Sequence, residues 1–599
     1  MKSLLALNGY IWRYRTLVLL GILVVTVSNF FAVYPAQIVR IAINMVSEVL
    51  GLFSLFRGFE ASKSLESLLA GNLILFGILV LLMAALRGVF LFFTRQTLIV
   101  MSRKVEFDLR SDLYHKFQEL TLSFYRRNRT GDLMARLTED VSRVRMYLGP
   151  GIMYSLSTLT LFIVTVSTML VVNWELTLYS LIPLPILSYL VYFVESRILK
   201  RSEEVQEQLS RLTTYTQEMF SGIRVVKAYV KEADAESRFD AETETYKRKS
   251  MHLAAIDAFF FPVVVMLVGL SVLITVWIGG ERVIAGRLTM GNIAEFIMYI
   301  NLLTWPIISV GWVSTMIQRA AASQQRLNVL LAERPEIRFP ETGPQPQTAA
   351  LAFDDVSYTY PDTGIEAIRN VTFRLSPGQK LGIVGPTGSG KSTLCALIPR
   401  LLEAEDGTIA LDGRDIKVYT KEDLRQNLGY APQDVFLFSD TVKGNIAFGH
   451  MAATDDEVVR AATRAAVHDN IVDFQQGYDT VVGERGVTLS GGQKQRISLA
   501  RAWVREPKLL ILDDILSAVD THTEETVLQH LREFRQLHPE SAVVQVAHRI
   551  SCIQDSDLIL VLENGRITQA GTHEDLIQQE GFYGRIHRKQ LMEAAETGA

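Results

Sequence analysis

The residues best suited to chemistry form the run Gly385-Pro-Thr-Gly-Ser-Gly-Lys391-Ser392. Glycines let backbone N–H groups close around phosphate oxygens, and the N-terminus of a following helix favours negative charge. Lys391 can then reach the β- and γ-phosphates of a nucleotide, and the Ser392 hydroxyl can bind Mg²⁺. The run follows the apolar segment Leu381–Val384 and precedes a helical stretch, which is the context of a P-loop. The predicted nucleotide-binding residues of the loop are Gly385, Pro386, Thr387, Gly388, Ser389, Gly390, Lys391, Ser392 and Thr393.

A second candidate element is the apolar run Leu509–Leu512, which ends in Asp513 and Asp514. An acidic pair at the end of a buried strand is costly unless it meets a cation. A strand that ends in Asp is common, but beside a P-loop it predicts a metal site. We therefore expect Asp513 to complete the Mg²⁺ site, directly or through water.

These residues need a scaffold that brings them together. From Leu351 onward, short apolar runs alternate with helical stretches, as at Lys380–Val384, Leu509–Leu512 and Ala542–Val546. The alternation predicts an α/β domain with a mainly parallel sheet.

The first part of the chain is different. It contains six apolar runs of about 20 residues, the length that crosses a hydrocarbon core of roughly 30 Å. Six such runs with few internal charges are not typical of a soluble domain, so they predict an all-α transmembrane domain of six helices. The predicted spans lie near Thr16–Ala36, Asn72–Phe93, Gly151–Val172, Leu176–Phe193, Phe259–Ile278 and Ile293–Met316.

The domain boundaries follow from these patterns. Residues 1–318 form the predicted transmembrane domain, and residues 350–590 form the α/β domain. Between them lies a linker at 319–349, where four prolines between Glu333 and Gln347 break any helix. Residues 591–599 are expected to be a C-terminal tail.

Lys and Arg gather in two long segments between spans, at residues 95–146 and 197–250. Because positive charge marks cytoplasmic loops, both segments and the N-terminus are predicted to face the cytoplasm. Helix formers with apolar residues three and four apart predict that each segment extends the flanking spans inward. The two turns are expected at Asn128 and Gly131 and at Gly222. At ~1.5 Å per residue, such helices reach about 35 Å beyond the membrane.

Composition excludes several classes of protein. Lys plus Arg number 60 and Asp plus Glu 64, and the net charge of −4 argues against nucleic-acid binding through bulk charge. The two cysteines, Cys395 and Cys552, exclude a disulfide scaffold and a four-cysteine zinc module. We interpret them as reduced packing residues.

Further motifs follow the P-loop in a characteristic order. They are Gln433 in Ala-Pro-Gln-Asp, Leu489-Ser-Gly-Gly-Gln493, the Asp513 strand, Ser517-Ala-Val-Asp520 and His548 in Val-Ala-His-Arg. This order and spacing resembles the nucleotide-binding domain of ABC transporters, and the Leu-Ser-Gly-Gly-Gln signature is its most specific part. Six spans ahead of the domain resemble a half-transporter of the ABC exporter type, so the resemblance covers essentially the whole chain.

The resemblance implies a role for each matching residue in binding ATP and Mg²⁺. Tyr360 would stack on the adenine, and His548 would hold the γ-phosphate. Gln433 would contact Mg²⁺ and the attacking water. The implied metal-binding residues are Ser392, Gln433 and Asp513.

The resemblance also implies a second half-transporter subunit as partner, with two ATP molecules between two nucleotide-binding domains. Asp520 would cross that interface. The signature residues that would cap an ATP bound to the other subunit are Ser490, Gly491, Gly492 and Gln493. Thr480-Val-Val-Gly-Glu484-Arg-Gly486 resembles an exporter loop that touches the cytoplasmic helix tips. Those tips, near Phe124–Thr130 and Phe220–Lys227, would be the coupling helices.

One residue departs from the family pattern. The position after the Mg²⁺ aspartate usually holds a glutamate that polarises the attacking water, and here it is Asp514. Aspartate is one methylene shorter, so its carboxylate falls short by roughly 1.5 Å. Misplacement on that scale can cost on the order of 10²-fold in rate. We therefore expect slow hydrolysis at this chain's own site. This asymmetry resembles one subunit of heterodimeric bacterial multidrug exporters, while a working Asp514 would fit either a homodimer or a heterodimer.

The sequence thus predicts half of an ATP-driven exporter in a bacterial plasma (inner) membrane, moving amphipathic drugs, lipids or peptides. Its catalytic residues would be Asp514, His548 and Gln433. The alternatives are a homodimeric lipid flippase or multidrug exporter with two working sites, and, in another class, a nucleotide-gated channel or regulatory membrane protein. The six spans exclude a soluble ABC ATPase that acts on nucleic acid.

Overall fold

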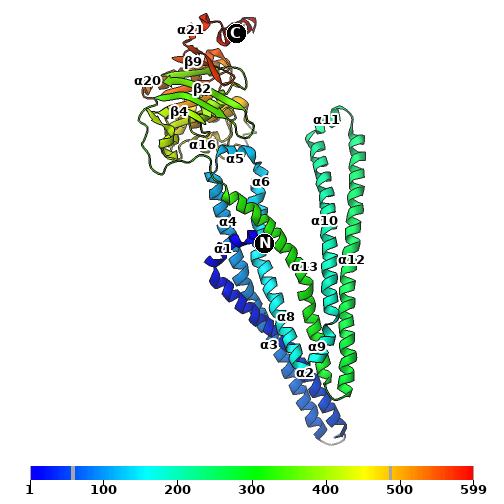
Figure 1. The fold of residues 1–599 in the computed structure, drawn as a ribbon. Helices are drawn as coiled ribbons and strands as arrows, with labels where there is room; N and C mark the ends of the chain where they lie inside the picture. The colour runs from blue at the N-terminus through cyan, green and yellow to red at the C-terminus, as the bar shows by residue number, and fades with distance from the viewer. Residues whose placement is uncertain (1, 56–60, 484–488, 598–599) are drawn as a thin grey trace. The chain divides into compact units, whose positions relative to one another are not determined.

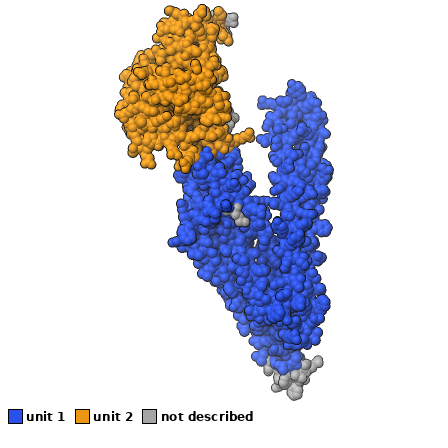
Figure 2. All heavy atoms as spheres, in the orientation of Figure 1, with its two compact units in different colours: residues 1–118, 131–333 blue, residues 119–130, 334–599 orange. Residues whose placement is uncertain are grey.

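The chain divides into two compact units, which Figure 2 colours separately. The computed structural model describes residues 2–55, 61–483 and 489–597. Unit 1 comprises Met1–Gln118 and Gly131–Glu333, and unit 2 comprises Glu119–Thr130 and Arg334–Ala599. The short segment 119–130 therefore belongs with the C-terminal part of the chain, although it lies in the sequence between the second and third spans.

Helices joined by short turns make up the regular structure of unit 1 in its described residues (Figure 1). Its α-helices are α1 (Asn8–Arg13), α2 (Arg15–Leu55), α3 (Ala61–Thr94), α4 (Val100–Glu119), α6 (Thr130–Ala135), α7 (Val141–Met146), α8 (Ile152–Val172), α9 (Trp174–Leu181), α10 (Pro183–Ser221), α11 (Ile223–Ala228), α12 (Glu232–Ile284) and α13 (Met290–Ala332). Single π-helical turns at Arg95–Ile99, Arg136–Asp140 and Tyr147–Gly151 join neighbouring helices into longer rods.

Six of these rods are long and apolar enough to cross a membrane, which confirms the six predicted spans. They are Arg15–Leu52, Leu65–Glu119, Thr130–Val172, Trp174–Ser221, Glu232–Ile284 and Met290–Ala332. Each continues well beyond an apolar run, because the flanking residues are strong helix formers.

Helices that extend the spans beyond their apolar runs are present in unit 1. Helices α10 and α12 lie side by side, and α11 follows the turn at Gly222 between them (Figure 1). Helix α13 runs past Gln318, where the sequence prediction ended the transmembrane domain, to Ala332. The residues after Gln318 are still helix formers, and the helix ends just before Pro335 because proline disfavours helical backbone in the residue that precedes it.

Unit 2 contains α5 (Leu122–Arg127) and two sheets. The strands are β1 (Leu351–Thr359), β2 (Glu366–Leu375), β3 (Lys380–Val384), β4 (Asp406–Leu411), β5 (Arg414–Asp415), β6 (Leu428–Ala431), β7 (Leu509–Asp513), β8 (Ala542–Val546), β9 (Leu558–Glu563) and β10 (Arg566–Gly571). The remaining helices are α14 (Lys391–Leu397), α15 (Lys421–Gln426), α16 (Val442–Ala447), α17 (Asp455–Arg464), α18 (His468–Val472), α19 (Gly491–Trp503), α20 (Thr521–Leu537), α21 (His573–Gln578) and α22 (Phe582–Thr597).

The larger sheet has the order β10-β9-β3-β8-β7-β6, and all its pairs are parallel except β9 with β10. This confirms the predicted α/β domain with a mainly parallel sheet. Strands β3, β7 and β8 are fully buried, as their continuous apolar runs require. A second, antiparallel sheet of order β2-β1-β4-β5 packs its apolar residues into a core with β3 and α14. At the C-terminus, α22 extends to Thr597, so the described part of the segment predicted as a tail, residues 591–597, is helical.

Candidate functional site

The P-loop connects β3 to α14, as the sequence predicts. Its glycines are required by close backbone contacts. A Cβ atom at Gly385 would lie 2.0 Å from the carbonyl oxygen of Leu562, and one at Gly390 would lie 2.3 Å from that of Ala367. Gly390 also has φ +102°, a conformation that side chains rarely allow. The P-loop backbone therefore packs directly against the backbones of β9 and β2.

Two polar groups of this loop fit a bound phosphate. The Lys391 ammonium donates to the carbonyl oxygens of Gly385 and Pro386, at 2.9 and 2.8 Å. Burial lowers the pKa of Lys391, while the nearby carboxylates of Asp514 and Asp513 act in the opposite direction. The Ser389 hydroxyl is buried with no hydrogen-bond partner among the described residues. A phosphate oxygen would satisfy the Ser389 hydroxyl and would offer the Lys391 ammonium a charged partner in place of the carbonyls.

The residues present also fit Mg²⁺. Asp513 ends β7 and is 2 % exposed, and the Ser392 hydroxyl donates to its Oδ1 at 3.1 Å. Burial raises the pKa of Asp513, and the neighbouring Asp514 adds to the rise. A divalent cation would compensate this buried charge, and hydroxyl and carboxylate oxygens are ligands that Mg²⁺ prefers. Ser392 and Asp513, with Gln433, would hold it.

The structure brings the three predicted catalytic residues together. The Gln433 side-chain amide donates to Asp514 Oδ2 at 3.3 Å, and His548 Nε2 lies 3.8 Å from the same oxygen. The Asp514 backbone N–H donates to the carbonyl of Val546 at the end of β8. Asp514 has φ +52°, in the left-handed region that aspartate tolerates better than most residues. Its carboxylate is thus positioned from several sides.

The signature residues lie at the start of α19. Ser490 is the N-cap, and its side chain and that of Gln493 form a reciprocal capping box. A Cβ atom at Gly492 would lie 2.8 Å from the carbonyl oxygen of Ala518, so the segment before α20 packs closely on this turn.

Gln495, which sequence reasoning missed, fixes that segment. Its amide donates to the Ser517 hydroxyl at 3.1 Å and accepts from the Ala518 backbone N–H at 3.0 Å. Asp520 caps α20 by accepting from the Thr523 backbone N–H at 2.9 Å, and this bond lowers the pKa of Asp520. No sequence motif predicts these contacts of Gln495, because they depend on how the two segments pack together.

Tyr360 shares unit 2 with the first helix tip, whereas the second tip lies in unit 1. The Tyr360 hydroxyl is 2.8 Å from that of Thr393, which places the ring beside the P-loop helix. Helix α5, at the first predicted tip, lies in unit 2, whereas α11, at the second, lies in unit 1. In the loop predicted to touch these tips, Glu484 and Gly486 lie outside the described residues.

Helix α5 is held by a residue that sequence reasoning did not identify. The Arg127 guanidinium pairs with the Glu336 carboxylate, and the Ser123 hydroxyl donates to the same group. The Phe124 side chain is buried. Because Glu336 follows more than two hundred residues later, no local pattern could reveal this contact.

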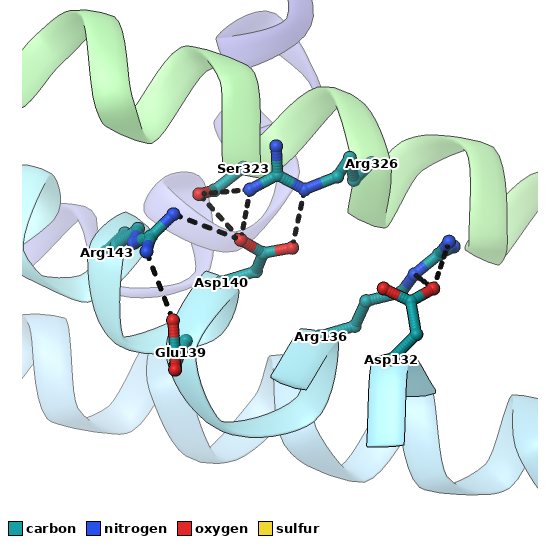
Figure 3. A network of polar contacts seen from close by, with 7 residues as sticks. All are labelled: Asp132, Arg136, Glu139, Asp140, Arg143, Ser323 and Arg326. Atoms are coloured by element: carbon teal, nitrogen blue, oxygen red, sulfur yellow. Dashed lines mark hydrogen bonds and ion pairs between the residues drawn. The ribbon is translucent and has the colours of Figure 1, made fainter. Parts of the chain in front are cut away.

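Within unit 1, a buried carboxylate ties two rods together just before the linker (Figure 3). Asp140 is 5 % exposed. It accepts from the Arg326 guanidinium, at 2.9 Å for Nε, and from the Ser323 hydroxyl at 2.8 Å. Arg143 lies nearby, with Nη1 3.9 Å from Asp140. This network fixes the end of α13, from which the chain continues to unit 2.

Comparison with known proteins agrees with these features. The family described as "ABC transporter transmembrane region" matches residues 16–307, and the family described as "ABC transporter" matches residues 368–517. The multidrug resistance-like ATP-binding protein MdlA of Escherichia coli is 40% identical over 82% of this chain and 83% of its own length. The probable multidrug resistance ABC transporter protein YheI of Bacillus subtilis is 38% identical over 82% of this chain and 84% of its own.

A solved structure, that of a bacterial Atm1-family ABC exporter with ATP bound, is similar over nearly the whole chain. It covers 96% of this chain and 99% of its own, with a TM-score of 0.75 and 26% sequence identity. The order of six spans and an ATPase domain, the P-loop geometry and these relatives lead to one conclusion. The chain belongs to the ABC transporter family, as an exporter-type half-transporter whose transmembrane region is fused to its ATPase domain.

Proposed function

We propose that this chain is one half of an exporter that uses ATP to move amphipathic compounds out across the bacterial plasma membrane. Its N-terminus and nucleotide-binding domain would lie in the cytoplasm. The family supplies the general activity, and the finer statements rest on two regions described below: a cavity in unit 1 and the surroundings of Asp514 in unit 2.

The cavity supports the substrate class. A space of about 840 Å³ lies among α8, α9, α10 and α13 of unit 1. Its lining is mostly apolar, including Leu159, Phe162 and Val313, with a few hydroxyl groups such as Thr158 and Ser309. Pockets of this size and composition bind largely apolar molecules and orient them through a few polar contacts. An amphipathic drug, lipid or peptide fits this description.

The roles of the ATPase residues follow from their positions. Tyr360 would stack on the adenine, and Lys391 would turn from its loop carbonyls to the phosphates. Bound Mg²⁺ would neutralise charge on the β- and γ-phosphates. Gln433 would orient the attacking water, His548 would donate to the γ-phosphate, and Asp514 would accept a hydrogen bond from that water.

The heterodimer proposal rests on the short side chain of Asp514. Its carboxylate is already engaged by Gln433 at 3.3 Å, and it cannot extend by another methylene toward a nucleotide. The signature residues from Ser490 to Gln493 are intact and could complete a site on a subunit that carries the glutamate. We therefore propose a partner half-transporter that supplies most of the ATP hydrolysis.

A homodimer with two working sites is the second candidate. It is favoured by the same cluster, because Gln433 and His548 both lie within 4 Å of Asp514, as an active site would need. The two candidates differ in what this chain does alone.

ATP turnover of the full chain in lipid, beside Asp514→Glu, tests the proposal. Near-silence of the unmodified chain, raised about 10²-fold by glutamate, supports an impaired site. Asp456→Glu, an exposed change of the same chemistry in α17, is the matched control and should do nothing. Vigorous turnover without the glutamate would instead establish the homodimer. Stimulation by hydrophobic compounds supports export, whereas an ATP-gated current would favour a channel.

A further inference from the structure

The starting observation is a contact between α5 and Tyr360, both in unit 2. The guanidinium carbon of Arg126 lies 4.1 Å from the centre of the Tyr360 ring. This is well inside the roughly 6 Å range of a cation–π interaction. A planar guanidinium stacks on an aromatic face better than an ammonium does. The residue proposed to stack on adenine therefore already carries a planar cation.

The remaining contacts of Tyr360 restrict which face is open. Its hydroxyl is tied to Thr393 at 2.8 Å, and its ring packs against the core formed by β1, β2 and α14. Tyr358 lies beside it, with the two ring planes at 87° and the centres 5.0 Å apart. The ring is thus held at its hydroxyl and on its inner side, so the face covered by Arg126 is its outer face.

Helix α5 is independently anchored, so Arg126 is not a loose surface side chain. Arg127 and Ser123 both bind Glu336, and the Phe124 side chain is buried. These contacts would remain if Arg126 left the ring. The Arg126 contact can therefore break and re-form while α5 stays attached to unit 2.

We propose that Arg126 and the adenine of ATP compete for the same face of Tyr360. Binding of ATP displaces the guanidinium, and this weakens one of the contacts that hold α5. Helix α5 links the second and third spans. Nucleotide binding therefore changes how firmly the connection between these two spans is held to unit 2. By reciprocity, a movement that withdraws α5 raises the affinity for ATP by the same factor. The inference rests on the proposed function, since it takes Tyr360 as the adenine-binding residue.

The test measures MgATP affinity of the full-length chain in lipid, with wild type, Arg126→Ala and Arg129→Ala compared. Competition predicts that Arg126→Ala binds MgATP about two- to fivefold more tightly than wild type, the worth of an exposed cation–π contact. Arg129→Ala removes the same charge two residues after α5 ends, and it should bind MgATP as wild type does because the Arg126–Tyr360 contact is kept. Thermal melting of each variant verifies that it is folded.

Three further results decide the proposal. In a Tyr360→Leu background, Arg126→Ala should no longer change affinity, because the shared ring is absent. Weaker binding by Arg126→Ala than by Arg129→Ala would show that the arginine assists the nucleotide, and equal affinity to wild type would show no competition. Either overturns the inference and leaves the proposed function intact. Failure of the wild-type chain itself to bind MgATP would overturn the proposed function instead.

Discussion

The P-loop face and the signature face of unit 2 are built in opposite ways. Lys391, Asp513 and Asp514 on the first face are each less than 10 % exposed. They lie close enough for the charge of each to affect the others electrostatically. On the signature face, Ser490 and Gly491 are exposed, and the available groups are backbone N–H groups at a helix start. The first face forms a charged site from residues of this chain alone. The second face presents backbone N–H donors that would contact a nucleotide bound to the partner subunit. A change on each face should therefore affect a different ATP molecule.

The largest effect is expected from Lys391→Ala on the P-loop face. Loss of the charge-assisted contacts to two phosphates should weaken MgATP binding by at least about 10²-fold. A nucleotide-binding titration of the full chain measures this. Binding that survives the change would mean that the loop does not hold the phosphates.

On the signature face, Gly492→Ala should leave MgATP binding to this chain unchanged. The new Cβ would lie 2.8 Å from the carbonyl oxygen of Ala518, and this atom belongs to the backbone and cannot swing away. The displaced signature should lower turnover of the assembled dimer by about tenfold. Turnover and binding measured on one preparation separate the two faces, and a parallel loss of binding would contradict the comparison.

Asp513→Asn should remove Mg²⁺-dependent binding yet raise the melting temperature of the nucleotide-free protein at pH 7. Burial raises the pKa of Asp513, so the folded state holds this proton more tightly than the unfolded state, and ionisation at neutral pH is destabilising. The gain should therefore shrink as the pH falls through the raised pKa. Melting temperatures of the variant and wild type, measured without nucleotide over a series of pH values, test this. A variant that is less stable than wild type at pH 7 would contradict the prediction.

The smallest effect is expected from Ser490→Ala. It removes the N-cap of α19 and should lower stability by about 0.5–1 kcal/mol. Ser490→Asn, which can still cap the helix, is the matched control and should retain most of the stability. Equal melting temperatures of the alanine variant and wild type would indicate that the capping box contributes little.

Much of this fold follows from local sequence. The six spans and the strands at Lys380–Val384 and Ala542–Val546 were predictable, because hydrophobic length and strand-loop-helix order are local properties. The motif order also indicated which residues would gather around Asp514. The contact of Arg127 with Glu336 was not predictable, since it joins segments far apart in the chain through packing alone. Nor was the left-handed backbone of Asp514, because aspartate also occupies ordinary regions.

The position of α5 has a consequence for how the protein is made. Unit 2 needs the segment 119–130, yet the rest of that unit begins at Arg334, roughly 200 residues later. During synthesis, this segment must wait until the ATPase sheet has emerged before its contacts can form. A gene fragment that starts at residue 334 would encode an ATPase unit without its own first helix. Such a fragment would leave Glu336 and the outer face of Tyr360 uncovered, and its nucleotide affinity would not represent that of the whole protein.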